Sequence, residues 1–248
     1  MVALPDVERR SAMPPSSGRT SSDGSATVPG LRRKTAVQAR FTWQTGCSDV
    51  FEPGARLLAM AAPRRIVIQP YSHQWPSDFE KVKVTLQDGL SDVAARIDHI
   101  GSTSVPGLAA KNIIDVQVSV ADLADPRLVP AFVKLGATAT DITRDHVPPG
   151  DQSGPSAWEK RYFRPPASWR PTHIHVREVG RANTRYALLF RDYLRHSTPA
   201  AAAYAQIKVT LSRLHPEDVD AYYAVKDPVC DLIMDAAEQW ADSTGWSP

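Results

Sequence analysis

Residues 99–118 read HIGSTSVPGLAAKNIIDVQV, and this stretch decides the fold of the chain. A glycine followed by three hydroxyl residues leads through Lys111 into an apolar run that contains one acid, Asp115. Valine and isoleucine dominate residues 112–120, which predicts a β-strand. Side chains alternate between the faces of a strand, so Asp115 and Gln117 should share one face. A buried ionised carboxylate is costly, so Asp115 needs a cation, a hydrogen-bond network or solvent.

The polar loop before this strand is a candidate phosphate-binding element. Gly101 allows a tight turn and a close approach of the backbone to a ligand. Ser102, Thr103 and Ser104 offer hydroxyl and amide groups that suit phosphate oxygens. The loop matches neither the GxxxxGK[ST] pattern nor the GxGxxG pattern. From the local pattern alone, a polar turn with capping hydroxyls is an equally good interpretation.

A second strand with a polar face is predicted at residues 172–178, THIHVRE. Its alternation places His173, His175 and Arg177 on one face. Two imidazoles at positions i and i+2 can reach one metal ion. They equally suit phosphate binding, acid–base chemistry or a plain solvent-facing surface. Arg161 and Arg164 precede this strand, and their guanidinium groups suit phosphate contacts unless they lie at a solvated edge.

The composition limits the class of protein. The 248 residues are 42% hydrophobic and 23% charged, which is typical of a soluble globular protein of one or two domains. A net charge of +2 argues against nucleic-acid or membrane-surface binding. No apolar stretch reaches the roughly 18 residues that a membrane span requires. The two cysteines are far apart, and no secretory signal is recognisable, so a cytoplasmic location is expected.

The chain divides into three predicted parts. Residues 1–62 contain few large apolar side chains and are expected to be a disordered extension. Residues 63–241 should form one mixed α/β domain, and residues 242–248 a tail. Within the domain we expect strands at 65–70, 95–100, 112–120 and 172–178, a helix opened by a capping box of Ser77 and Glu80, a helix at 128–135, an irregular segment at 138–166, and C-terminal helices interrupted at Pro216 and Asp227-Pro228.

The stretch 99–118 resembles the hallmark segment of the GrpB family. Further segments match the family in order: IQPYSHQWPSDFE (68–80), RYFRPP (161–166), THIHVRE (172–178), LLFRDYLR (188–195) and YAQIKVTLSRLHPEDVDAYYAVKDPVCDLI (204–233). The resemblance spans roughly residues 65–238. It implies a nucleotidyltransferase-like mixed sheet flanked by helices, with a helical C-terminal part. Similar domains also occur fused to dephospho-coenzyme A kinases, where they resemble an appended module.

The resemblance also suggests roles for individual residues. Gly101-Ser102 matches the Gly-Ser pair of nucleotidyltransferase folds, and Asp115 matches the first metal-binding acid. Gln117 stands where a second acid is expected, and His173 or His175 where a later acid is expected. This departure argues against ordinary two-metal nucleotidyl transfer. It favours a single-metal transferase, another metal-dependent reaction, or a nucleotide-binding domain without catalysis.

The leading interpretation is a protein that binds a nucleotide or another phosphorylated small molecule, with metal-assisted nucleotidyl transfer as its candidate reaction. The candidate catalytic residues are Asp115, Gln117, His173 and His175; the candidate phosphate-binding residues are Gly101, Ser102, Thr103, Ser104, Lys111, Arg161 and Arg164. The expected cofactor is a divalent metal, either magnesium or a transition metal. One alternative is a transition-metal-dependent enzyme that uses Asp115, His173 and His175. The other is a non-catalytic interaction or folding module related to the coenzyme A kinase appendages.

Overall fold

The computed structural model describes residues 65–248, which form a five-stranded mixed sheet and five α-helices. The strands lie in the order β1-β2-β5-β4-β3, with β1 at Ala94–Ile100, β2 at Ile114–Val120, β3 at Thr138–Ala139, β4 at Arg161–Arg164 and β5 at Thr172–Glu178. β2 and β5 are parallel neighbours, and the other pairs are antiparallel. This confirms the predicted mixed α/β class. The predicted disordered extension, residues 1–62, lies outside the described residues.

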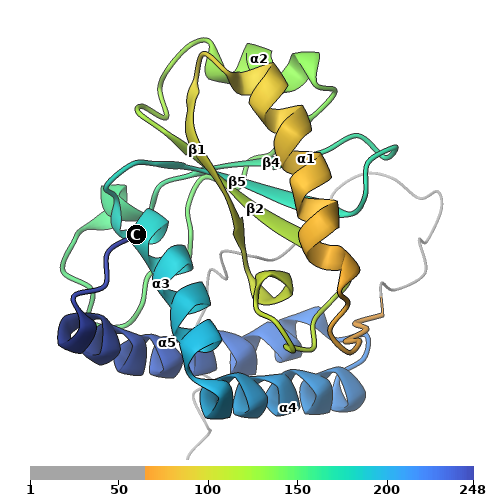
Figure 1. Ribbon diagram of the computed structural model, residues 1–248, viewed down its shortest axis with the longest axis vertical. Coiled ribbons are helices and arrows are strands. Elements are labelled where there is room, and N and C mark those ends of the chain that lie inside the picture. Colours follow the sequence, from red (N-terminus) through yellow and green to blue (C-terminus); the bar gives the residue numbers. More distant parts are fainter. Residues whose placement is uncertain (1–64) are drawn as a thin grey trace, which may run out of the picture. The chain divides into compact units, whose positions relative to one another are not determined.

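The helices lie on two sides of this sheet (Figure 1). They are α1 at Gln74–Leu90, α2 at Leu128–Lys134, α3 at Ala182–His196, α4 at Thr198–Leu214 and α5 at Val219–Thr244. α1 and α2 pack together on one face, whereas α3 contacts β1 and β5 from the other. α4 and α5 lie side by side at the end of the sheet. The C-terminal third is therefore helical, as the sequence predicts.

The main hydrophobic core lies between the sheet and the pair α1 and α2. The α1 side chains that enter it recur at helical spacing: Trp75, Phe79, Val82, Leu86 and Leu90. From the sheet, Val116 and Val118 of β2 and Ile174 and Val176 of β5 face them. Each such burial contributes about 1.5–3 kcal/mol relative to an exposed side chain. Because the apolar side chains use this face, the polar side chains of both strands point to the opposite one.

The beginning of the domain differs from the prediction in two places. Residues 65–70 form no strand: Gln69 forms an isolated β-bridge with Ala110, and the Ile66 amide donates to the Pro216 carbonyl at 2.7 Å. α1 begins at Gln74, three residues before the predicted cap, and the hydroxyl of Ser77 donates to the Gln74 carbonyl instead. The predicted capping box is therefore wrong. Pro76 is tolerated because the amides of the first turn have no intrahelical partner.

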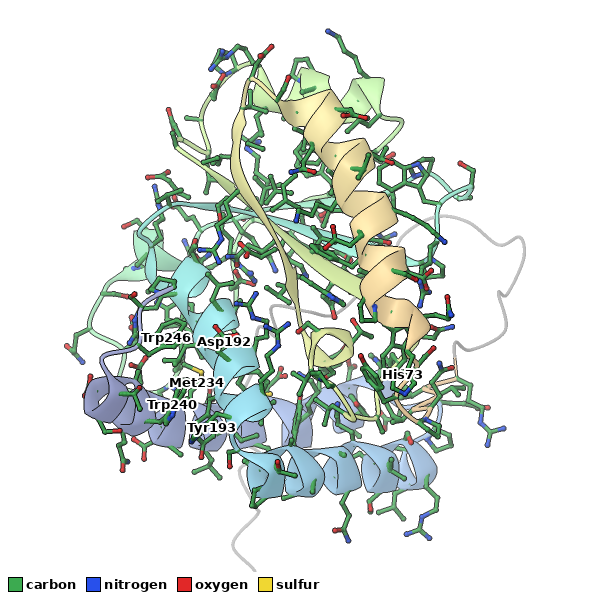
Figure 2. The ribbon with its side chains drawn as sticks, in the orientation of Figure 1. His73, Asp192, Tyr193, Met234, Trp240 and Trp246 are labelled. Carbon is green, nitrogen blue, oxygen red and sulfur yellow. The ribbon has the colours of Figure 1, made fainter. Side chains whose placement is uncertain are left out.

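The C-terminal region also corrects the prediction. α5 runs through Pro228 without a break, so the expected interruption at Asp227-Pro228 is wrong. The helix continues to Thr244, and Trp246 then folds back so that its Nε1 donates to Asp192 of α3 at 3.2 Å (Figure 2). β4 forms within the segment that was expected to be irregular. No helix within residues 65–248 is long and apolar enough to cross a bilayer.

Candidate functional site

The polar residues predicted on two separate strands meet on one face of the sheet. β2 and β5 pair in parallel with Asp115 opposite His173 and Gln117 opposite His175. Both strands alternate polar and apolar residues, and the register aligns the two patterns. The apolar residues of both strands enter the core, which fixes this register, because a shift by one residue would reverse every side chain.

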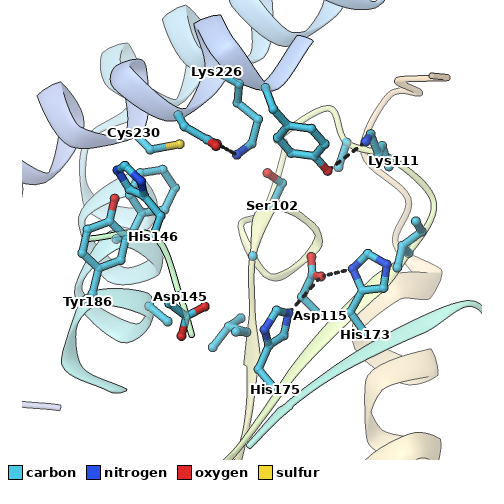
Figure 3. Close-up of a pocket in the computed structure, with 18 of the residues that line it drawn as sticks. Ser102, Lys111, Asp115, Asp145, His146, His173, His175, Tyr186, Lys226 and Cys230 are labelled. Carbon is cyan, nitrogen blue, oxygen red and sulfur yellow. Dashed lines mark hydrogen bonds and ion pairs between the residues drawn. The ribbon is translucent and has the colours of Figure 1, made fainter. Parts of the chain in front are cut away.

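Asp115, His173 and His175 form a compact cluster at one end of this face (Figure 3). One ligand atom from each residue lies within 4.8 Å of the others. The Nδ1 atom of His173 lies 3.0 Å from Asp115 Oδ1, and the Nε2 atom of His175 lies 4.0 Å from the same oxygen. Two imidazoles and one carboxylate can hold a divalent ion, with a preference for transition metals over magnesium.

The surroundings of His175 favour the neutral imidazole that metal binding requires. This residue is only 7% exposed, and its Nδ1 lies 3.4 Å from the ammonium of Lys160. Burial, together with the charges of Lys160 and Arg177, lowers the pKa of His175 well below its usual value. The two cations are balanced by Asp145, which contacts each of them at 2.8 Å. Burial opposes ionisation of Asp145, but Arg177 and Lys160 outweigh it and hold its pKa far below the usual range.

Gly101 determines where the Asp115 carboxylate can lie. Its backbone φ angle is 68°, which lies in a region that residues other than glycine rarely adopt. An added Cβ would overlap the carboxylate of Asp115. The glycine therefore lets the loop close against the acid and presents Ser102, on the short 3-10 helix η1 (Ser102–Ser104), beside it.

A cavity of about 270 Å³ opens from this cluster toward α3, α4 and α5, which is near the lower end of the range for small-molecule sites. Three lysines from different segments line it: Lys111 before β2, Lys208 on α4 and Lys226 on α5. Lys111 lies about 4.9 Å from the ring centre of Tyr222 and 4.8 Å from that of Tyr223. Aromatic side chains of α3 and α4 complete the lining: Tyr186, Phe190 and Tyr204.

Lys208 is the most buried of these three lysines, with 2% of its surface exposed. Its Nζ lies 2.8 Å from Ser102 Oγ and 2.6 Å from the carbonyl oxygen of Ala109. Burial lowers its pKa to about 7, and the nearby charge of Lys226 acts in the same direction. The candidate phosphate-binding loop is thus joined to the C-terminal helices through this amine.

The structure places most of the predicted site residues in the cavity wall, namely Gly101, Ser102, Thr103, Lys111, Asp115, His173 and His175. The other four lie elsewhere. Ser104 donates to the Gly101 carbonyl at 2.6 Å, and Arg161 donates to the Leu123 carbonyl at 2.7 Å. Arg164 is exposed on β4 and does not line the cavity.

Gln117 is the fourth residue outside the cavity. It is fully buried, and both ends of its amide are bonded. Arg177 Nη1 donates to its Oε1 at 2.6 Å, and its Nε2 donates to the Thr184 carbonyl at 3.3 Å. Its amide therefore connects β2 to β5 and α3.

Sequence reasoning missed the parts of the site that come from the C-terminal helices and from the segment between β3 and β4. The cavity residues that it did not propose include Asp145, His146, Lys208, Tyr222, Tyr223 and Lys226. The position of Lys208 in the sequence could have indicated a buried lysine, because it lies in the apolar stripe of α4. A lysine in such a stripe must either extend its amine to the surface or find polar partners inside.

Comparison with known proteins identifies a family and several relatives of this chain. Residues 65–236 match the family model described as GrpB protein. The chain is 35% identical over 201 residues to a protein named dephospho-CoA kinase from Mycolicibacterium paratuberculosis, which covers 75% of this chain and 49% of that protein. It is also 35% identical over 174 residues to UPF0157 protein PA4798 from Pseudomonas aeruginosa, covering 70% and 68%.

A solved structure supports the same relationship. The crystal structure of GrpB from Enterococcus faecalis superposes with a TM-score of 0.55 at 29% identity, covering 70% of this chain and 99% of that one. The chain spans about half the length of the relatives named dephospho-CoA kinase. The family model covers well over half of the chain, and the fold agrees with the solved relative. This chain belongs to the GrpB protein family.

Proposed function

We propose that this protein binds a nucleotide or another phosphorylated small molecule together with one divalent transition-metal ion. The observation that carries the proposal is the opening of the Asp115, His173 and His175 cluster onto a cavity with three lysines. A divalent ion held there would supply positive charge to phosphate oxygens. The donor set of two nitrogens and one carboxylate oxygen suits zinc, manganese or iron better than magnesium.

Different residues of the cavity would bind different parts of the ligand. The hydroxyl of Ser102 and the ammonium groups of the lysines would hydrogen-bond phosphate oxygens, since charge-assisted bonds of this kind are strong. Tyr186 and Phe190, whose rings stack with centres 6.3 Å apart, offer an apolar surface for a base or another flat group. The cavity would thus hold both ends of a nucleotide-like ligand.

Metal-assisted nucleotidyl transfer is the reaction that this arrangement supports best, with one ion rather than two. The position that would supply a second acid is Gln117, which is buried and bonded to Arg177 and Thr184. An amide in that position offers neither negative charge nor a free oxygen. The proposal therefore specifies one metal ion per chain.

Metal content tests the first part of the proposal. After equilibration with zinc or manganese and removal of excess ion, the wild type should retain about one ion per chain by elemental analysis. His173→Ala and His175→Ala should each lose it. His215→Ala, at the end of α4 and outside the cavity, is the control. Equal metal content in the wild type and His175→Ala would contradict the proposed site.

A ligand screen tests the second part. With metal present, thermal melting is measured with ATP, ADP, coenzyme A precursors and inorganic pyrophosphate. A ligand present at 100 times its Kd should stabilise the fold by about 2.7 kcal/mol. Asp115→Asn should abolish the metal-dependent part of the shift. Loss of metal-dependent nucleotide turnover in Asp115→Ala, with the fold retained, would further support transfer chemistry.

A second candidate is a non-catalytic interaction or folding module. The observation that favours it is that the match covers about half of each relative named dephospho-CoA kinase, so the shared region is one part of a longer protein. A module of this kind would bind no small molecule in the cavity. A screen in which neither metals nor ligands shift the melting temperature would favour this candidate over the first.

A further inference from the structure

Lys208 differs from Lys160 and Lys226 in having no acidic partner within residues 65–248. Lys160 is paired with Asp145 at 2.8 Å, and Lys226 with Asp227 at 2.9 Å. Lys208 contacts only the neutral oxygens of Ser102 and Ala109, and no carboxylate within residues 65–248 forms an ion pair with it. A buried ammonium without a counterion is unfavourable, so burial shifts this amine toward its neutral form.

The groups that surround Lys208 do not supply the missing charge. Tyr204 of the same helix places its ring centre 4.4 Å from the amine. From α5, Lys226 opposes protonation, whereas Cys230 favours it. From β2, Asp115 also favours protonation, but its carboxylate is already in contact with His173. The balance of these effects holds the pKa of Lys208 near 7, where a nearby negative charge is enough to change the protonation state of the amine.

We propose that Lys208 is neutral in the empty site above neutral pH and takes up one proton from solvent when a phosphate dianion enters the cavity. The inference rests on the proposed function, because it requires a phosphorylated ligand. Lys208 would then respond to the charge of the ligand, because a phosphate dianion supplies the counterion that no carboxylate of the described residues provides. Ligands of similar shape without a dianionic group do not charge the amine and bind more weakly.

Protonation also changes what Ser102 can do. The lone pair of a neutral Lys208 can accept a hydrogen bond from the Ser102 hydroxyl while the amine donates to the Ala109 carbonyl. Once charged, the amine has three N–H donors and no lone pair, so Ser102 Oγ becomes the acceptor of that contact. The serine hydroxyl proton is then free to turn toward a phosphate oxygen. Protonation of Lys208 thus turns two groups of the cavity, the lysine ammonium and the serine hydroxyl, into hydrogen-bond donors for a phosphate group.

Linkage gives the direction of the pH dependence. At pH 6 Lys208 is already charged in the free protein, so ligand binding causes almost no proton uptake by this side chain. At pH 8 the free site is neutral at Lys208 and the complex is charged, so uptake approaches one proton per ligand. Affinity should therefore fall as pH rises above 7, by up to about tenfold per pH unit.

The test is calorimetric titration of the metal-loaded protein with ATP, ADP and inorganic pyrophosphate. Titrations at pH 6 and pH 8, each in two buffers of different ionisation enthalpy, count the protons taken up. Wild type should gain close to one more proton at pH 8 than Lys208→Arg, whose guanidinium is charged throughout. Lys208→Met should bind at least tenfold more weakly and lose the same uptake. Lys111→Met is the matched control, since it removes a cavity lysine but should keep the uptake.

The outcomes separate this inference from the proposed function. Ligand binding with equal uptake in wild type and Lys208→Arg would overturn the role of Lys208 alone. Failure of all three probes to bind the metal-loaded wild type would overturn the proposed function and the inference with it. Wild-type uptake that does not rise between pH 6 and pH 8 would also overturn the inference, and this measurement needs no variant to fold.

Discussion

Gly101 is the residue whose replacement most directly tests the geometry of the candidate metal site. An alanine there would adopt an unfavourable backbone conformation and place its Cβ against the Asp115 carboxylate. Strain of this kind costs roughly 1–3 kcal/mol, which a folded domain can survive. Gly101→Ala should therefore retain the fold and bind zinc or manganese at least tenfold more weakly, as measured by calorimetry.

Gly107 provides the control for this prediction. It also has a positive φ, 79°, but an added Cβ would meet nothing within 4 Å. Gly107→Ala should lose stability through backbone strain and leave metal affinity unchanged. Equal losses of affinity in the two variants would show that strain, rather than displacement of Asp115, is responsible.

Gln117 leads to a prediction about charge. A glutamate side chain at this position would face Arg177 favourably, but it would replace the donor to the Thr184 carbonyl with an oxygen. The Thr184 carbonyl keeps its hydrogen bond within α3, so the lost contact should cost about 0.5–1.5 kcal/mol, and repulsion between the two oxygens adds to this. Gln117→Glu should therefore lower the melting temperature and still bind one metal ion per chain by elemental analysis. Two ions per chain would show that the introduced carboxylate can turn into the cavity.

At the scale of single residues, the sequence predicted the strand side of the site well. Alternation placed Asp115 on one face of its strand and His173 and His175 on one face of theirs, and the parallel register of the two strands brings these faces together. The roles of Gln117 and Arg161 could not be predicted, because they depend on neighbours far away in the chain. Gln117 is bonded to a carbonyl 67 positions later, and no local pattern encodes such a partner.

Among the elements, the segment between β3 and β4 is attached to α5 by a contact that depends on pH. His146 Nε2 lies 2.9 Å from Asp231 Oδ2. The hydrogen bond to Asp231 raises the pKa of His146 above its usual value. The attachment is therefore complete below pH about 6.5 and is lost as pH rises through the raised value. Amide hydrogen exchange in residues 145–153, corrected for intrinsic rates, should be faster at pH 8.5 than at pH 6.

A variant identifies the contact that controls this exchange. Asp231→Asn removes the charge that favours protonated His146, so it should abolish the pH dependence. The neighbouring contact of Asp145 with Arg177 should not titrate in this range, because the pKa of Asp145 is far below it. A pH dependence that persists in Asp231→Asn would place the switch elsewhere.

Helix boundaries show where local signals fail. Ser77 and Glu80 fit the capping pattern, yet α1 starts at Gln74, because Trp75 is buried in the core and donates to Asn112 at 2.8 Å. Pro228 should break a helix, since a proline inside one costs about 3 kcal/mol. α5 continues because its residues on both sides of Pro228, Tyr222 and Met234, are buried against other elements. Tertiary packing outweighs the local preference in both cases.

For the whole molecule, the candidate site is an assembly of distant segments. The strand wall comes from residues 101–115 and 173–175, and the opposite wall comes from α3, α4 and α5. The sequence predicted both a strand layer and C-terminal helices, and the family resemblance supplied the fold. It could not show that those helices cover the polar face of the sheet, because their orientation depends on packing between elements. Lys208 and Lys226 were missed for this reason.

The central position of the candidate metal ligands leads to the last prediction. Asp115 lies on β2, and His173 and His175 lie on β5, which are adjacent strands whose other face forms the main core. An ion bound to both strands cannot remain bound once the sheet unfolds, so it should stabilise the whole cooperative unit. Zinc at 100 times its Kd should raise the free energy of unfolding by about 2.7 kcal/mol. In urea titrations the midpoint should increase while the m-value stays constant.

The same titration distinguishes this site from weak binding elsewhere on the surface. His173→Ala lacks one ligand but retains the core, so its midpoint should not respond to zinc, and a chelator should return the wild type to the metal-free curve. An equal increase in both proteins would mean that zinc binds outside the cluster. A changed m-value in the wild type would mean that the ion alters the surface exposed on unfolding. A constant m-value with a higher midpoint would mean that the ion stabilises the folded sheet without changing the surface that unfolding exposes, as expected for an ion that joins two strands already paired in the core.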